Sequence, residues 1–154
     1  MKLRNSIIRG TMQAVLGVSA WLAAKESRAA WSRHAMRAMA DWTVRSKRIA
    51  PAQDLASLGA AWQRSFPSKK QVPITAVTAD TVYAEIQTPC PLRGSGNLHA
   101  CHRMMEFDRH VLARAGGQFV VLDSQATPGR TYCRVAMRMA GASLDGLSAA
   151  HEHA

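Results

Sequence analysis

The sequence predicts a single α+β domain, in which N-terminal helices pack on a small, mostly antiparallel, four-stranded sheet with one long helix between the two hairpin halves. One observation is the alanine-rich, proline-free helical pattern of residues 1–49. Another is the change to strand-like alternation from residue 71 onward. A length of 154 residues, of which 47% are hydrophobic and 19% charged, fits one core.

Residues 1–49 predict two helices with a bend near Glu26-Ser27. The uncharged run from Gly10 to Ala24 is 15 residues long. A bilayer-spanning helix needs roughly 20 apolar residues. We therefore expect a buried or interfacial helix here, and the alternatives are a cleaved signal or a membrane-surface anchor.

The second of these helices is expected to be amphipathic, with a basic outer face. Its predicted core-facing stripe consists of Trp31, Ala35, Met39, Trp42 and Ile49. Its predicted outer, surface-binding residues are Arg33, Arg37, Lys47 and Arg48.

A third helix is expected over residues 52–66, with Pro51 in its first turn, because four apolar residues recur at helical spacing before Pro67. They are Leu55, Leu58, Trp62 and Phe66. From residue 71 the apolar positions alternate in two runs, around 72–76 and 82–86, which predicts a β-hairpin. Pro73 places its first strand at a sheet edge.

A long helix is expected over residues 97–115, with Asn97 as its N-cap and Gly116-Gly117 at its end. Strands are expected over 119–122 and 131–139, joined by a type II turn at 127–130. The organisation is therefore a basic helical region over 1–70, in the same domain or as an arm, and a core over 71–140. A flexible tail follows over 141–154, with a short helix expected around 144–150.

The positive charge is concentrated in the helical region. Residues 1–70 hold 13 Lys and Arg against 3 Asp and Glu, whereas residues 71–154 hold 7 of each kind. Such asymmetry favours an anionic partner or membrane surface, or simply a solvated basic face. Specific nucleic-acid binding is not expected, because the arginines lack aromatic interleaving and a recognition motif.

The candidate chemical site lies between Thr88 and His102, where two cysteines and two histidines occur together. Cys90 follows a predicted strand, Cys101 lies in the first turns of the long helix, and Cys133 faces the apolar side of the last strand. Three thiols from three elements are thus able to converge. The number and spacing of cysteines do not match a secreted disulfide framework, which favours a cytoplasmic protein, with peripheral membrane association as an addition.

Three uses of these thiols stay open. Cys90, Cys101 and Cys133 form a candidate zinc or iron site, with a fourth ligand from His99, His102 or Asp108. Alternatively, Cys90 or Cys101 is a nucleophile, or the thiols are merely buried. Asp108 shares an apolar helical face with Cys101, Met105 and Leu112, and burial would raise its pKa and suit it to acid/base chemistry. The alternatives are a metal ligand, a partner in a buried hydrogen bond, or a salt bridge to Arg93, Arg134 or an arginine of another helix.

One family resemblance rests on residues 71–139. The chain has Cys90-Pro91-Leu92, then Cys101 with Asp108 seven positions on, then Gly117 and the run Gly129-Arg130-Thr131-Tyr132-Cys133-Arg134-Val135. This pattern resembles the L-2-amino-thiazoline-4-carboxylic acid hydrolase-like family and, more distantly, V4R-type small-molecule sensor domains. Where a V4R metal site has an acid and a cysteine, this chain has Asp123-Ser124-Gln125-Ala126.

The resemblance implies helices ahead of a small antiparallel sheet and hydrolytic opening of a ring that contains sulfur and nitrogen. It also places Cys90, Cys101, Asp108 and Cys133 at recurring positions of the family. The expected function is thus a small hydrolase of this type with a Cys/Asp site. The alternative is a non-enzymatic metal- or small-ligand-binding module that docks through its basic helices. The sequence does not specify the substrate. A homo-oligomer is compatible with either function.

Overall fold

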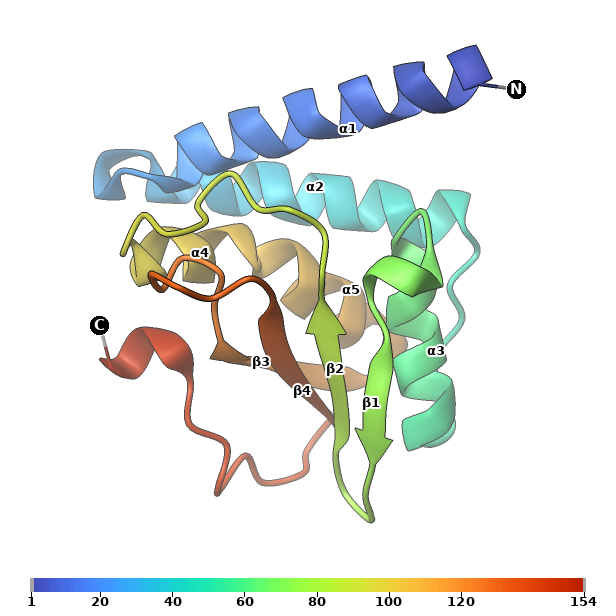
Figure 1. Ribbon diagram of the computed structural model, residues 1–154. Coiled ribbons are helices and arrows are strands. Elements are labelled where there is room, and N and C mark those ends of the chain that lie inside the picture. Colours follow the sequence, from blue (N-terminus) through green and yellow to red (C-terminus); the bar gives the residue numbers. More distant parts are fainter. Residues whose placement is uncertain (1, 154) are drawn as a thin grey trace.

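The computed structural model describes residues 2–153, and it describes side chains for residues 10–11 and 13–153. Its helices and strands form the predicted α+β domain (Figure 1). The sheet is four-stranded and antiparallel throughout, in the order β1-β2-β4-β3. The strands are β1 (Ile74–Val77), β2 (Val82–Ile86), β3 (Gly117–Asp123) and β4 (Cys133–Met139).

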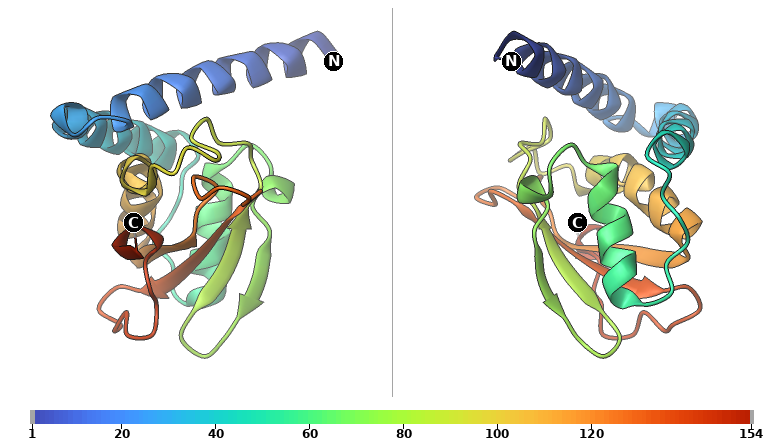
Figure 2. Two further views of the ribbon diagram at one scale, coloured as in Figure 1. Left: turned by 60° about the vertical axis from the view of Figure 1, so that its left-hand side comes forward. Right: turned by 90° about the vertical axis from the view of Figure 1, so that its right-hand side faces the viewer.

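The two N-terminal helices are α1 (Lys2–Ala23) and α2 (Ala29–Ser46), separated by the 3-10 helix η1 (Glu26–Arg28) at the predicted bend. They run antiparallel as the outermost layer, and the N-terminal end of α1 projects past the rest of the molecule (Figures 1 and 2). No helix among residues 2–153 is both long enough and apolar enough to span a bilayer.

The buried face of α2 differs from the predicted one. Ser32, Met36, Ala40 and Thr43 are buried, whereas Trp31 is 72% exposed and Trp42 is 69% exposed. Most of these buried side chains are small, which allows the backbone of α2 to pack close to α1 and α5. The indoles of Trp31 and Trp42 are exposed, which corrects the predicted stripe at these two positions, whereas Ile49 is buried as predicted. The buried face of α2 is therefore rotated around the helix axis from the predicted one.

Helix α3 (Leu55–Ser65) packs on one face of the sheet, and Leu58 and Trp62 on its predicted apolar face are fully buried. It begins at Asp54 rather than near Pro51, because the Asp54 carboxylate accepts a hydrogen bond from the Ser57 backbone in a capping box. The 3-10 helix η2 (Lys69–Gln71) then leads into β1, which is an edge strand as Pro73 predicted.

The predicted helix over 97–115 is two helices, α4 (Leu98–Met104) and α5 (Glu106–Ala115), with a break at Met105. The expected caps are present: Asn97 accepts from the Ala100 backbone, and Gly116 ends α5 with φ 85°. The type II turn is also confirmed, since Gly129 has φ 84° and the Arg130 N–H donates to the Thr127 carbonyl.

One core cluster spans the chain from Ala20 in α1 to Met137 in β4. The basic helical region over 1–70 therefore contributes to the same core as residues 71–140. After β4 the tail folds back and ends in the 3-10 helix η3 (Ala150–His153), where His151 stacks on His102 of α4 with 3.7 Å between ring centroids.

Candidate functional site: an apolar pocket beneath the first two helices

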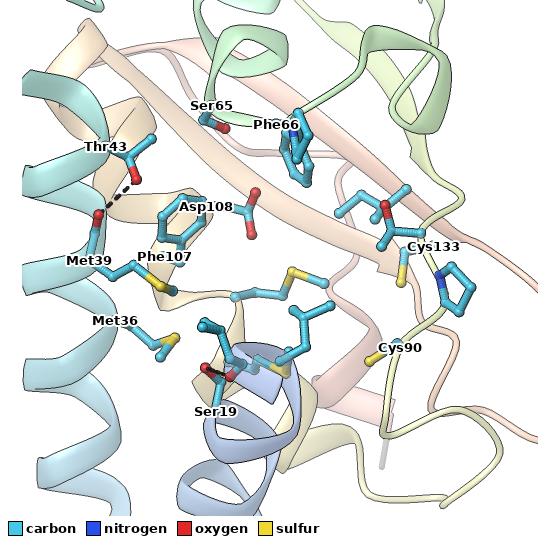
Figure 3. Close-up of a pocket in the computed structure, with 18 of the residues that line it drawn as sticks. Ser19, Met36, Met39, Thr43, Ser65, Phe66, Cys90, Phe107, Asp108 and Cys133 are labelled. Carbon is cyan, nitrogen blue, oxygen red and sulfur yellow. Dashed lines mark hydrogen bonds between the residues drawn. The ribbon is translucent and has the colours of Figure 1, made fainter. Parts of the chain in front are cut away.

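The main cavity is a pocket of about 640 Å³ beneath α1 and α2. Helix α2 forms one wall and α1 another, while the end of α3, the loop after β2, the junction of α4 and α5 and the start of β4 complete the enclosure (Figure 3). Apart from Thr11, Ser19, Thr43, Ser65, Thr88, Asp108 and Gln125, and the thiols of Cys90 and Cys133, the described side chains that line it are apolar. They include Val15, Leu16, Met36, Met39, Trp42, Phe66, Ile86, Pro89, Met104, Met105 and Phe107.

Asp108 is the one acidic residue on the described part of the pocket wall. Its side chain is buried, and the indole N–H of Trp62 donates to its Oδ1 atom at 2.8 Å. Burial raises the pKa of Asp108 to about 6, although the Trp62 hydrogen bond and the charge of Arg109 oppose the shift. The predicted burial of this acid is confirmed, and of the partners expected for it the buried hydrogen bond forms, from Trp62, rather than a salt bridge to an arginine.

Gln125 closes the pocket on the side of Cys90, and its side chain is fully buried. Its Oε1 atom accepts from the Cys90 backbone N–H and twice from Arg93, at 2.7 to 3.2 Å. Its Nε2 atom donates to the carbonyls of Ile86 and Thr88. One amide side chain thus fixes the loop that carries Cys90 and the end of β2.

The three cysteines are free and divide between two cavities. Cys90 and Cys133 line the main pocket, whereas Cys101 lines a much smaller cavity with His102, Ser124 and His151. The sulfur of Cys101 accepts from the Ser124 hydroxyl at 3.0 Å, and the sulfur of Cys133 accepts from the Gln125 backbone N–H at 3.3 Å. The thiols therefore lie in one region without forming a single site.

Burial raises the pKa of all three thiols, to about 11 for Cys101 and about 12 for Cys133. At neutral pH such thiols are protonated and are poor nucleophiles. The hydrogen bonds found for the three sulfurs come from Leu92, Ser124 and Gln125, and among the described residues no histidine donates to a sulfur. A Cys–His nucleophile pair is thus not assembled.

The predicted metal site is also not assembled. Among residues 2–153, no group of three or more His, Cys, Asp or Glu side chains is placed to hold a metal ion. The proposed ligands Cys90, Cys101, Cys133 and His102 belong to separate cavities, and His102 stacks on His151 instead. Burial, followed by the charges of Arg109 and His151, lowers the pKa of His102 to about 4.

The four predicted surface-binding residues do not act alike. Arg33, Arg37 and Arg48 are exposed, and Arg37 also pairs with Glu106 of α5 at 2.7 Å. The ammonium group of Lys47 donates to the Ser65 and Phe66 carbonyls at the end of α3, and burial lowers its pKa. Arg37 and Lys47 therefore connect elements of the domain.

Sequence reasoning did not identify Gln125 or Trp62 as site residues. A glutamine in a loop and a tryptophan at helical spacing are ordinary features of a sequence. Their roles follow from partners that are 32 to 46 positions away in the chain.

Comparisons of this chain with protein-family models, with curated proteins and with solved structures find no match.

Proposed function

We propose that this protein is a small-ligand-binding module whose pocket takes one largely apolar molecule with a single hydrogen-bonding group. The observation that carries this proposal is the pocket of about 640 Å³ beneath α1 and α2. Ligand sites in proteins commonly measure about 300–1,000 Å³ and combine apolar walls with a few placed polar groups. Four methionines, Met36, Met39, Met104 and Met105, give these walls an adaptable shape.

Asp108 supports the polar part of the proposal. A carboxylate offers about four acceptor positions on its two oxygens, and Trp62 occupies one of them. With a pKa of about 6, Asp108 is mainly ionised at neutral pH and accepts a hydrogen bond from a ligand N–H or O–H group. No Lys, Arg or His is found among the described lining residues. An anionic ligand would lose hydration here without gaining an ionic partner, so the favoured ligand is neutral.

A neutral fluorescent probe with one N–H group, N-phenyl-1-naphthylamine, tests the proposal. We expect saturable binding of one probe per chain, with a rise in probe fluorescence and energy transfer from Trp42 on the pocket wall. Met39→Trp fills the pocket and should weaken probe binding by about tenfold or more, which corresponds to loss of the apolar contacts of one side chain.

Met139→Trp is the matched control, because Met139 is also a half-buried methionine but is not among the described lining residues. It should bind the probe as the unchanged protein does. Absence of saturable binding, or equal weakening in both variants, contradicts a ligand-binding pocket.

A second candidate is the ring-opening hydrolase that the family resemblance implies. It is supported by the presence of Asp108, with a pKa of about 6, beside Cys90 and Cys133 in one cavity. An acid that titrates near neutrality is suited to proton transfer. It ranks second because the thiols are protonated at neutral pH and because a carboxylate-bearing substrate finds no cation among the described lining residues.

Incubation with 2-amino-2-thiazoline-4-carboxylate, followed by chromatography of the ring-opened product, tests the hydrolase. Turnover that Asp108→Asn abolishes and Cys101→Ser retains would support acid/base catalysis in the main pocket. Absence of turnover, in a protein that still binds the fluorescent probe, would leave the ligand-binding function alone.

A further inference from the structure

The outer layer formed by α1 and α2 exposes an unusual amount of apolar surface. The described residues include eight exposed large hydrophobic side chains, and five of them belong to these two helices. They are Val15, Val18, Trp21, Trp31 and Trp42. Scattered exposed apolar residues are ordinary, but a concentration on one pair of helices marks an interaction surface.

The exposed side of α1 carries no charge between residues 10 and 24. Gly10, Ala14, Gly17, Val18 and Trp21 are exposed there and recur at helical spacing. On α2, Trp31, Trp42 and Arg45 are exposed at positions that share one side of the helix. The guanidinium group of Arg28 stacks over the Trp21 ring, 3.9 Å from its centroid, which adds a cation beside an exposed indole.

The charges of this layer are sorted by side. Residues 1–48 contain ten Lys and Arg but only two acids, Glu26 and Asp41. Both acids pair with the body of the domain: Glu26 with Arg103 of α4 at 2.6 Å, and Asp41 with Arg114 of α5 at 2.9 Å. Among the described residues, the exposed Lys25 and Arg45 form no salt bridge, so their charges are available to an anionic partner.

We propose that the α1–α2 layer docks the protein on the surface of an anionic lipid bilayer. Indole rings are amphipathic and favour the headgroup region, and basic residues are attracted to anionic headgroups. Because no helix in the described residues is suited to span a bilayer, the layer lies along the surface. The bound surface is defined by Val15, Val18, Trp21, Trp31 and Trp42 with Lys25, Arg28 and Arg45.

The charges of this surface argue against two other binding partners, a second copy of the chain and a nucleic acid. A second copy of the chain would bring two strongly basic layers together, which like-charge repulsion opposes. A nucleic acid would satisfy the charges, but it would leave Val15 and Val18 in contact with phosphates and water. A bilayer satisfies both the charged and the apolar residues.

The docking surface is continuous with the pocket. Val15 and Trp42 belong to both, since each lines the cavity and is exposed on the outer layer. A molecule dissolved in the bilayer would thus meet the rim of the pocket without crossing water. This route rests on the proposed ligand-binding function, and it indicates a membrane-dissolved, neutral apolar ligand.

Co-sedimentation with vesicles tests the docking. We expect the full chain to bind vesicles of phosphatidylcholine and phosphatidylglycerol but not phosphatidylcholine alone, and to dissociate as salt is raised. Lys25→Gln with Arg45→Gln should weaken binding about 30-fold, because the attraction of each basic side chain to anionic lipid is worth roughly fivefold in affinity. Val18→Glu should weaken it about tenfold or more.

Val77→Glu is the matched control, because Val77 is also an exposed valine and lies at the end of β1, away from α1 and α2 in Figure 1. It should leave vesicle binding unchanged. The proposal would be overturned if the chain did not bind anionic vesicles, or if both valine variants lost binding. It would also be overturned if the chain preferred single-stranded DNA to lipid, so that the DNA displaced it from the vesicles. Val18, Lys25 and Arg45 are not among the described lining residues of the pocket, so N-phenyl-1-naphthylamine binding without vesicles reports the pocket separately.

Discussion

The indole N–H of Trp62 donates to the Asp108 carboxylate at 2.8 Å, which joins α3 to α5 inside the domain. Both side chains are buried, and Asp108 lies on the wall of the main pocket. Tryptophan thus supplies the hydrogen bond that a buried acid needs, without neutralising its charge. The acid is fixed in position while its pKa stays above the usual range for a carboxyl group.

Asp108→Asn is expected to stabilise the protein at neutral pH. The folded-state pKa is raised from 3.8 to about 6, so folding favours the protonated acid. Burying the ionised form of Asp108 therefore lowers the free energy of unfolding. This loss is absent below pH 3.8, grows as pH rises and is complete above about pH 6. An asparagine stays neutral and retains a carbonyl oxygen for Trp62.

The expected gain in free energy of unfolding is about 3 kcal/mol at about pH 7.5 and close to zero at about pH 4. Urea denaturation of both proteins at the two pH values measures it. His102 also titrates in this range, but it is present in both proteins and cancels in the difference. A difference that is the same at both pH values contradicts the assigned titration.

Gln125→Ala is expected to destabilise the fold by about 3 kcal/mol, because it leaves buried polar partners without hydrogen bonds. The affected groups are the Cys90 N–H and the carbonyls of Ile86 and Thr88, whereas Arg93 is exposed and keeps its hydrogen bond to the Thr131 carbonyl. Hydrogen exchange at the Cys90 amide should accelerate together with the loss of stability. Gln87→Ala, at an exposed glutamine, is the control and should change stability by about 0.5 kcal/mol or less.

The three thiols are expected to differ in reactivity. Cys90 is half-buried, whereas Cys101 and Cys133 are buried and have higher pKa values. Titration with a disulfide reagent near neutral pH should therefore show one faster thiol in the folded protein and three equivalent thiols in denaturant. Cys90→Ser should remove the faster phase and Cys101→Ser should keep it; the reverse result would show that Cys101 is the accessible thiol.

Much of the architecture was predictable from local sequence patterns. The bend at Glu26, the Asn97 cap, the Gly116 helix end and the type II turn at Gly129 all occur where the sequence placed them. Caps and turns depend on backbone geometry within a few residues, so their residue types identify them. The break at Met105 carries no proline or glycine, and the sequence therefore predicted one helix instead of two.

The candidate site was predictable only in part. The burial of Cys101, Asp108 and Cys133 was expected from their periodicity and is confirmed. Their grouping was not, because shared burial does not place side chains in the same cavity. Cys101 faces a small cavity beside Ser124, while Cys133 faces the main pocket.

By itself, the sequence determined the α+β class, the order of the elements, the edge position of β1 and the basic character of the N-terminal helices. It could do so because periodicity, caps and charge are local properties. The tertiary structure alone decided which side of α2 is buried, which residue hydrogen-bonds Asp108 and how the three thiols divide. It also created the pocket, whose walls come from segments between Thr11 and Cys133. The physical reason is that close packing selects among the faces a helix offers, and that selection depends on the sizes of side chains far away in the chain.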